Sequence, residues 1–326
     1  MKRLIYLFII LFHSWLYCYA ESGQRISVLD FGAIPDDGLD DSENIRKACE
    51  YCRDNKSTVL FFPPGLYNFR DSLALQIERE AISGVYGENV QGRLFKPDAP
   101  YVKALDLFGA ENLVVEAEGA ILLLEGWYEV VSIDKAREVT IKGLSIVYRR
   151  PPNTVGKITK LNEGSFDMQI DPERYFYLDK DVTGRVHYVD AMRERLYTGG
   201  RVSGKELLSK DMIRIYTDFR PSTGDFCVLR HSGHYRPAIM IKESSDIYIE
   251  GVKIHSQPGM GVVGHLSENI TLENLQVIPE AGMIISTNTD ATHFTSCKGE
   301  IVIENCKFGG QGDDCTNIHN YYYTIV

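Results

Sequence analysis

The sequence predicts an all-β fold: a right-handed parallel β-helix with an N-terminal capping helix and a small inserted β-domain. Three observations support this class. An eight-residue pattern recurs without gaps, its later copies follow at related intervals of 23 and 31 residues, and each copy has a turn-forming residue at the same place. The copies are VTIKGLSI at 139–146, IYIEGVKI at 247–254, ITLENLQV at 270–277 and IVIENCKF at 301–308. Recurring strand–turn–strand units are typical of stacked coils.

The pattern inside each copy explains why it should form a coil. Apolar residues occupy places one, three, six and eight, which gives short strands with inward-facing side chains. Place five is Gly143, Gly251, Asn274 or Asn305, and these residue types tolerate the left-handed backbone that a turn requires. A β-sandwich is the alternative, but it would not keep one template with its turn residue in register.

Residues 1–20 are predicted to be a secretory signal peptide. Lys2 and Arg3 precede an apolar run at 4–12, and Ala20 provides a small residue at the cleavage point. The apolar run is too short to span a bilayer, and no later segment is long and apolar enough to do so. A lipoprotein anchor on Cys18 is the alternative, disfavoured by the bulky residues at 15–17. We therefore expect export to the periplasm or the cell exterior.

Residues 21–70 are expected to cover the first coil. An acidic turn at 36–41 leads into an amphipathic helix from about Ser42 to Arg53, with Asp41 or Ser42 as the N-cap. A strand at 59–69, broken by Pro63-Pro64-Gly65, follows. A solenoid needs such a cap over its first exposed coil. A calcium site in the acidic turn is the alternative to a solvated capping turn.

The rest of the chain divides at a gap in the repeat. Coils are predicted at 71–152 and again at 237–326, but no copy of the pattern occurs between 153 and 236. Stretches such as SFDMQI and DMIRIY in that gap have alternating or β-rich character. We interpret 153–236 as a barrel-like β-domain inserted into one coil.

Charge and cysteine content narrow the class of partner. The net charge is −10, and it becomes −12 when Lys2 and Arg3 leave with the signal. An acidic chain without basic clusters argues against nucleic acid or an anionic membrane and is compatible with neutral ligands such as sugars. Cys49 and Cys52 have C-x-x-C spacing but no neighbouring metal ligands, so buried thiols or one local disulfide are preferred to zinc. Nothing in the sequence indicates an oligomeric state.

Three aspartates stand out in the last predicted coils. Asp290 precedes Asp313 and Asp314 by 23 and 24 residues, the interval of one coil. If the coil that begins at Ile270 places its extra residues in a loop, Asp290 lies beside Asp313 on adjacent coils, ~4.8 Å apart. Asp314 would lie next to them, provided that the backbone bends and brings neighbouring side chains to one cleft.

Clustered carboxylates suit the cleavage of glycosidic bonds. Like charges at close range raise one another's pKa, so one acid can stay protonated while its neighbours remain ionised. An inverting glycosidase uses a proton donor and a base that stand roughly 6.5–9.5 Å apart around a water. A ladder of surface aspartates and a cation site are the alternatives. We expect no metal or other cofactor.

Two segments, TNTDATHF and IVIENCKFGGQGDDCTNIH, resemble the active-site pattern of polygalacturonase-type hydrolases. The closer resemblance is to glycoside hydrolase family 110, the bacterial exo-acting α-1,3-galactosidases, and it extends to VLDFGAIPDDGLDDSENIRKACEYC and YRRPPNTVGKI. This resemblance implies inverting hydrolysis of terminal α-1,3-linked galactose, as on blood-group B-type or linear glycans. It also implies that Asp313 is the general acid and that Asp290 and Asp314 hold and deprotonate the attacking water.

Four polar residues beside the acids are candidate sugar ligands: Asn288, His293, Asn317 and His319. A structural hydrogen bond to the next coil is the alternative for each. Two other functions stay open, a polygalacturonase-like pectin hydrolase and a non-catalytic carbohydrate-binding β-helix. A pectin hydrolase would need basic residues in its groove to meet uronate carboxylates.

The chain ends 12 residues after Asp314, with no further copy of the pattern. Members of the family it resembles continue through more coils. We therefore expect a truncated product whose last coil exposes an unpaired apolar edge and whose activity is impaired.

Overall fold

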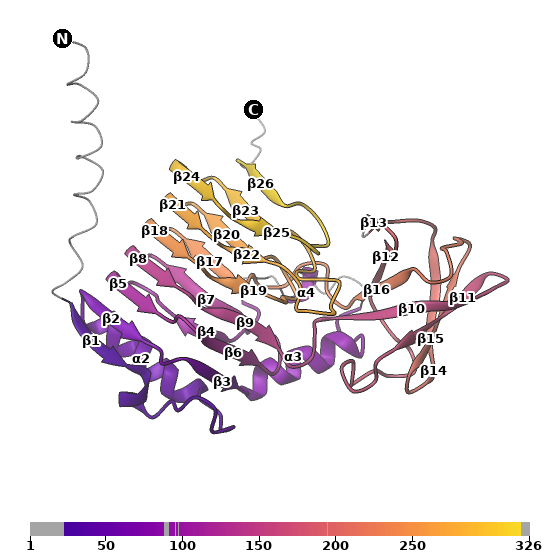
Figure 1. Cartoon of the computed structure of the whole chain (residues 1–326), viewed down its shortest axis with the longest axis horizontal. Coiled ribbons are helices and arrows are strands. Elements are labelled where there is room, and N and C mark those ends of the chain that lie inside the picture. Colours follow the sequence, from indigo (N-terminus) through magenta and orange to yellow (C-terminus); the bar gives the residue numbers. More distant parts are fainter. Residues whose placement is uncertain (1–22, 88–90, 95, 97, 194, 321–326) are drawn as a thin grey trace, which may run out of the picture.

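The computed structural model describes residues 23–87, 91–94, 96, 98–193 and 195–320, so the predicted signal peptide lies outside the described part. Its main body is a stack of coils in which three parallel sheets run along the stack (Figure 1). A separate antiparallel sheet projects from one side. The fold is mostly β, with parallel strands arranged as the sequence predicts.

From β2 onward, each coil contributes one short strand to each parallel sheet. The first sheet contains β1 (Gln24–Ser27), β2 (Thr58–Phe61), β5 (Glu111–Glu116), β8 (Arg137–Lys142), β18 (Ser245–Glu250), β21 (Glu268–Glu273) and β24 (Lys298–Glu304). The second contains β3 (Gly65–Phe69), β6 (Ala120–Leu124), β9 (Ser145–Tyr148), β19 (Lys253–Ile254), β22 (Gln276–Val277) and β25 (Lys307–Phe308). The third contains β4 (Lys103–Asp106), β7 (Glu129–Asp134), β17 (Ile239–Lys242), β20 (Val262–His265), β23 (Thr292–Thr295) and β26 (Thr316–His319).

The repeated pattern sets the register of the stack. Val139 pairs with Ile247, Ile247 with Ile270, and Ile270 with Ile301, so the first places of the four copies lie in one column. The first three of these side chains are at most 1% exposed. The apolar positions of the pattern therefore form the core, as predicted.

The turn residues of the pattern adopt the expected backbone. Gly143, Gly251, Asn274 and Asn305 all have positive φ, between 53° and 74°. At Gly143 a Cβ would also lie 2.6 Å from the Cα of Glu118, so a side chain has no room there. The prediction of a left-handed turn at place five is confirmed.

The predicted capping helix is α2, Ser42–Asp54, which ends one residue later than expected. Its buried face consists of Ile45, Ala48, Cys49 and Cys52, and the helix packs against β4 at the start of the stack. Both cysteines are free thiols, so the alternative of buried thiols holds and that of a local disulfide does not. Burial raises the pKa of the Cys52 thiol to about 12.

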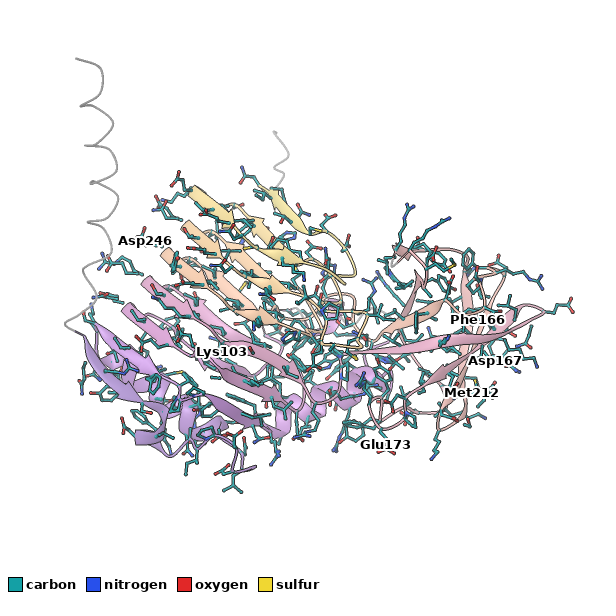
Figure 2. All side chains as sticks on the ribbon, in the orientation of Figure 1. Lys103, Phe166, Asp167, Glu173, Met212 and Asp246 are labelled. Carbon is teal, nitrogen blue, oxygen red and sulfur yellow. The ribbon has the colours of Figure 1, made fainter. Side chains whose placement is uncertain are left out.

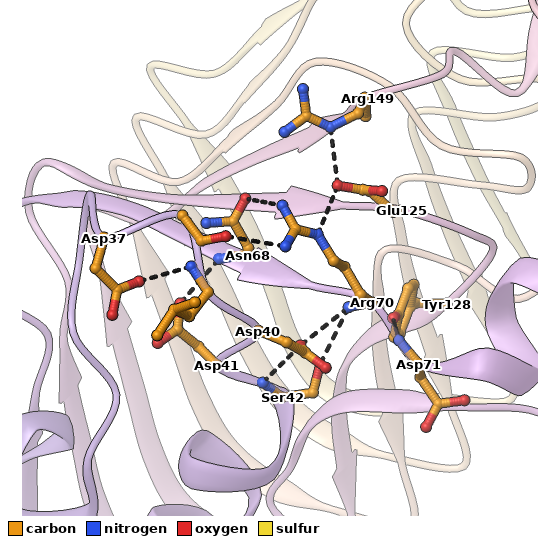
Figure 3. A network of polar contacts seen from close by, with 12 residues as sticks. Asp37, Asp40, Asp41, Ser42, Asn68, Arg70, Asp71, Glu125, Tyr128 and Arg149 are labelled. Carbon is orange, nitrogen blue, oxygen red and sulfur yellow. Dashed lines mark hydrogen bonds and ion pairs between the residues drawn. The ribbon is translucent and has the colours of Figure 1, made fainter.

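The acidic turn before α2 binds backbone amides (Figure 3). Asp41 occupies the N-cap position, but its carboxylate makes no cap bond to the helix and accepts from Ile34 N at 3.0 Å and Asn68 N at 2.9 Å instead. Asp40 accepts from the backbone N–H groups of Ser42 and Arg70, both at 3.1 Å. The turn thus fastens the cap to the end of β3. Asp41 is the N-cap residue, as predicted, although its side chain makes no hydrogen bond to the helix.

Helix α3, Ser72–Ile82, is an element that the sequence interpretation missed, since it placed only coils at 71–152. Asp71 caps it by accepting from Leu73 N at 2.8 Å and Ala74 N at 3.3 Å. The buried positions have helical spacing, but a glutamate, Glu78, interrupts the apolar face. The other short helices described are η1 (Val28–Phe31) and α4 (Gln91–Leu94).

Glu78 belongs to a buried charged site between α3 and the base of the projecting sheet. It is 2% exposed, and one of its oxygens has no hydrogen-bond partner among the described residues. Arg150, 1% exposed, is close enough to interact electrostatically and donates to Phe176 O at 2.7 Å and Thr154 Oγ1 at 3.1 Å. Burial raises the pKa of Glu78 to about 7 although Arg150 opposes the shift.

The projecting sheet occupies the segment for which we predicted an inserted domain. Its strands run in the order β13-β12-β16-β10-β11-β15-β14, all antiparallel, which leaves β13 and β14 at the two ends of an open order. They are β10 (Asn153–Asn162), β11 (Ser165–Ile170), β12 (Arg185–Asp190), β13 (Arg195–Tyr197), β14 (Val202–Ser209), β15 (Met212–Thr217) and β16 (Phe226–Arg230).

This sheet has its own hydrophobic core around Phe166, which is fully buried (Figure 2). On the same strand Asp167 accepts two hydrogen bonds from Arg214, at 2.7 and 3.0 Å. Ile285, from the long loop before Asp290, also packs into this core. The sheet therefore helps to fix the loop that leads to the candidate site. Within the described residues, no helix has both the length and the apolarity needed to cross a bilayer.

Candidate active site

The three aspartates predicted from the coil spacing come together in the structure. One carboxylate oxygen from each of Asp290, Asp313 and Asp314 lies within 4.8 Å of the others. Asp290 is 4% exposed, whereas Asp313 and Asp314 are exposed. Asp290 precedes β23 and the other two precede β26, the neighbouring strand of the third sheet. Adjacent coils therefore supply the cluster.

The register within the cluster differs from our expectation. Thr292 pairs with Thr316, and the backbone N–H of Ala291 donates to Asp314 O at 2.9 Å, so Asp290 is level with Asp314. We expected Asp290 to lie beside Asp313. The interval of 24 residues is the correct coil length here, because the extra residues of the preceding coil all come before Asp290.

A bend brings Asp313 to the same place as its neighbour. The backbone bends at Gly312 and Asp313, just before β26 begins. Gly312 N donates to Thr287 O at 3.0 Å, and a Cβ on Gly312 would lie 2.4 Å from Asn288 O. A glycine is therefore required for the close approach of the two coils. We expected Asp313 and Asp314 to converge only if the backbone bends between neighbouring side chains, and the structure contains this bend.

Asn288 is a structural residue in this arrangement. It is fully buried, and its amide nitrogen donates to Ser232 O at 3.3 Å and Pro258 O at 3.4 Å. Its backbone oxygen accepts from Arg230 Nη1 at 2.6 Å. The side chain of Asn288 is bonded to protein groups and is not exposed to solvent. The geometry therefore does not support our prediction that Asn288 contacts a sugar.

The other three predicted sugar ligands do lie at the acids. His293 Nδ1 is 2.7 Å from Asp290 Oδ2, and His293 Nε2 is 2.9 Å from His319 Nε2. Asn317 Nδ2 lies 3.5 Å from Asp314 Oδ2, at the limit of a hydrogen bond. Both imidazoles face a cavity. Their first contacts are thus with the protein, and they border the space in which a ligand would bind.

Two residues that the sequence interpretation missed complete the surroundings. Arg230, at the end of β16, is 8% exposed and is near enough to Asp313 to interact electrostatically. Burial lowers its pKa to about 10, helped by Arg185 and opposed by Asp313. His234 interacts with both Asp290 and Asp313, but burial is the larger influence and lowers its pKa. Arg230 ends the last strand of the projecting sheet and His234 follows it, 60 and 56 residues before Asp290 and still further from Asp313 and Asp314, so no local motif marks them.

A cavity of about 720 Å³ lies on the outer face of the third sheet and reaches His293 and His319, although none of the three acids lines it. Its volume is within the range of pockets that hold small organic ligands, roughly 300–1,000 Å³. Outward side chains of successive coils line it in two columns. One column is Ser132, Met240, Val263 and His293, and the other is Asp134, Lys242, His265, Thr295 and His319.

The walls of this cavity come from two other segments. Tyr101, just before β4, lies under the guanidinium of Arg236, whose carbon is 3.8 Å from the ring centre. Arg236 also approaches the buried Glu129 at 3.9 Å. Arg236 follows β16, the last strand of the projecting sheet, so the same connection that supplies His234 closes this end of the cavity.

The three acids are the one group of His, Cys, Asp or Glu side chains in the described ranges whose spacing would suit a metal ion. Their packing does not require one. Asp290 already binds His293, and Asp313 and Asp314 are open to water, which screens their repulsion. The cluster is equally well suited to proton transfer, in which an acid and bases surround one bond.

Comparisons with known proteins point to glycoside hydrolases. Residues 225–326, which contain the three acids, match the model of glycosyl hydrolases family 28. The chain is 25% identical to alpha-1,3-galactosidase A of Shewanella woodyi over 93% of its length and 26% identical to alpha-1,3-galactosidase B of Bacteroides thetaiotaomicron over 91%. It spans about half of these curated relatives, 52% and 51%.

Among solved structures, a family 28 exopolygalacturonase of Yersinia enterocolitica aligns with 91% of this chain and 45% of its own, with 13% identity and a TM-score of 0.41. By sequence, the chain is therefore similar to proteins named alpha-1,3-galactosidase over most of its length and to the glycosyl hydrolases family 28 model over its last third.

Proposed function

We propose that this protein is an exported exo-glycosidase that releases terminal α-1,3-linked galactose from glycans with inversion. The observation that carries the proposal is the convergence of Asp290, Asp313 and Asp314 from adjacent coils, with Asp290 in contact with His293 at the end of a cavity. The names of its curated relatives support galactose as the sugar.

The chemistry divides between the exposed and the buried acids. Asp313 donates a proton to the glycosidic oxygen as the bond from that oxygen to the anomeric carbon breaks. A water held between Asp290 and Asp314 forms the new bond to the anomeric carbon and loses a proton to Asp290. Asp313 is exposed, so it can regain its proton from solvent before the next turnover. Asp290 is held by His293 and so keeps a fixed orientation.

Spacing and family resemblance differ in the stereochemistry that they favour. The nearest oxygens of the acids lie within 4.8 Å, close to the ~5–5.5 Å separation of retaining enzymes and shorter than the ~6.5–9.5 Å of inverting ones. We propose inversion for two reasons. First, the distance between nearest oxygens is the smallest of the distances that describe the separation of two carboxyl groups. Second, because there are three carboxylates, Asp290 and Asp314 can hold a water while Asp313 acts as the acid.

The charges of the cavity favour a neutral sugar over a uronate. Lys242 pairs with Asp134 at 3.6 Å, and Arg236 pairs with Glu129 at 3.9 Å. A uronate chain would have to compete with these acids for the cations. Pectin hydrolysis is the second candidate, and the match to the family 28 model supports it. A non-catalytic glycan-binding protein is the third, but binding alone has no use for three clustered acids.

The test is to incubate the purified protein separately with α-1,3-galactobiose, a B-type trisaccharide and polygalacturonate, and to identify the released sugar by chromatography. We expect free galactose from the first two substrates and no product from the third. Release of galacturonate would replace the proposal with the pectinase alternative. Binding of the galactosides without any release would support the glycan-binding alternative.

A further inference from the structure

Two arginines face each other on neighbouring strands of the projecting sheet. Arg185, at the start of β12, pairs directly with Arg230, at the end of β16. Residues directly opposite in an antiparallel pair have their side chains on the same face, and like charges in that position repel each other. The guanidinium of Arg185 is exposed and makes no hydrogen bond or ion pair within the described residues, whereas Arg230 is 8% exposed. The pair therefore concentrates positive charge at one point of an acidic chain.

Polar atoms at this point lack hydrogen-bond partners. Arg230 Nη1 donates to Asn288 O at 2.6 Å, but Arg230 Nε is buried and has no partner in the described part of the chain. The same holds for Nδ1 of His187, which is two residues after Arg185 and on the same face of β12. Burial and the charges of Arg230 and Arg185 lower the pKa of His187 to about 4, so the three side chains lie together. A buried donor without a partner costs free energy, which an oxygen atom of a ligand would recover.

These three residues, Arg185, His187 and Arg230, form an arginine cluster that adjoins the acids. A Cβ on Gly312 would lie 3.2 Å from Arg230 Nη1, so this arginine packs against the bend that carries Asp313. Arg230 also interacts electrostatically with Asp313. Asp290 is instead bonded to His293, which lines the cavity. The proposed acid therefore lies toward the arginine cluster, and the proposed base lies toward the cavity.

This arrangement assigns the two sides of the bond that breaks. The acid protonates the leaving oxygen, so the leaving sugar lies on the side of Asp313 and the arginine cluster. The cavity is closed at its far end, where Arg236 covers Tyr101, and it therefore suits a terminal sugar. Arg185 Nη1 lies 4.0 Å from the position of a Cβ on Gly233, so the glycine leaves this guanidinium uncovered on that side.

We propose that Arg185 and Arg230 form a subsite for an anionic substituent, a sulfate ester or a carboxylate, on the sugar next to the terminal galactose. This inference rests on the proposed function, because it specifies the class of glycan from which galactose is released. Guanidinium groups bind such oxyanions through paired, charge-assisted hydrogen bonds. Arg236 and Lys242 in the cavity already pair with acids, so the terminal sugar is neutral and its neighbour carries the charge.

The kinetic test compares galactosides that share the α-1,3 linkage. The substrates are galactobiose, galactobiose with one sulfate on O2, O4 or O6 of the leaving galactose, and galactose linked to galacturonate. We expect kcat/KM of the wild type to be about tenfold higher on at least one charged substrate, the gain from 1.4 kcal/mol of added binding. Added salt should reduce this preference, because it screens exposed charges.

Arg185→Gln should abolish the preference for the charged substrate. Arg185 is exposed, so the substitution should leave the free energy of unfolding nearly unchanged. Arg195→Gln is the matched control and should keep the preference. Arg195 is an exposed arginine of the same sheet, but it pairs with Asp190 at the opposite end of β12. A charge preference that persists in Arg185→Gln would overturn the proposal.

A binding test does not depend on hydrolysis. The intact protein is titrated with galactose, with galactose 2-, 4- and 6-sulfate and with galacturonate, and dissociation constants are measured by NMR. We expect an anionic sugar to bind about tenfold more tightly than galactose in the wild type and not in Arg185→Gln. Tighter binding of a sulfated sugar alone identifies a sulfate ester as the substituent, and tighter binding of galacturonate alone identifies a carboxylate.

Equal affinity of the wild type for the neutral and the anionic sugars would contradict the anionic subsite. If binding depends on Arg185 but no galactoside is cleaved, the proposed function fails and the subsite stands.

Discussion

Asp313→Asn is expected to reduce galactose release from α-1,3-galactobiose by about 10²–10⁴-fold, the usual contribution of a general acid. An amide at this position keeps the shape of the side chain but has no proton acidic enough for the leaving oxygen. Because Asp313 is exposed, the substitution should leave the free energy of unfolding nearly unchanged. Rates with purified wild-type and variant protein, together with their unfolding curves, check both statements.

A comparison of substrates with poor and good leaving groups then distinguishes the residue that acts as general acid from the residues that activate water. An aryl α-galactoside with a good leaving group needs little protonation, so Asp313→Asn should recover much of its activity on it. Asp290→Asn and Asp314→Asn should not recover, because activation of the water is still missing. Asp54→Asn, at the exposed end of α2, is the matched control and should behave as wild type. Activity of Asp313→Asn within a few-fold of wild type on galactobiose would remove Asp313 from the role of acid.

Glu78 is expected to make the unfolding free energy depend on pH. Its pKa rises from 4.5 to about 7 on folding because of burial, a shift of 7 − 4.5, or about 2.5 units. The neutral form is thus favoured in the folded state. The associated stability is fully present below pH 4.5 and is lost as pH rises through 7. At 1.36 kcal/mol per unit the loss is about 3 kcal/mol.

The measurement is urea unfolding of wild type and Glu78→Gln at pH 5, 6, 7 and 8. The free energy of unfolding of the wild type minus that of Glu78→Gln should fall by about 3 kcal/mol as the pH rises to 8. Glu80→Gln on the same helix is the matched control. Hydrogen bonds from Tyr86 and Gln76 lower the pKa of Glu80, so its contribution should stay nearly flat from pH 5 to 8, where Glu80 is ionised in both the folded and the unfolded state. A flat difference for Glu78→Gln would show that Glu78 is ionised in the folded state at all these pH values.

The stack of coils could be predicted from the sequence because its causes are local and repeat. Inward apolar residues at alternate places and a Gly or Asn with positive φ are visible in each copy of the pattern. Helix α3 was missed for a physical reason as well. Glu78 stands at a buried position of the helix, so the apolar face of α3 is interrupted in the sequence, and Arg150 comes from the distant segment between β9 and β10.

The sequence predicts which acids form the site, but it does not predict which of them lie level with each other on adjacent coils. One coil interval placed Asp290 near Asp313 and Asp314, but the position of the loop residues decides which of them it faces, and the sequence does not show this. Asn288 looked like a sugar ligand because it is polar and adjacent to an acid. In the structure its amide holds the backbone of Ser232 and Pro258 instead.

The central claim is that acids from adjacent coils cleave a galactosidic bond through an activated water. The most direct test is ¹H NMR during the first minutes of hydrolysis of an aryl α-galactoside, which releases a single galactose, before that sugar mutarotates. We predict that β-galactose appears first. Initial release of α-galactose would mean that one of the acids attacks the sugar itself, and no release of galactose would contradict the account as a whole.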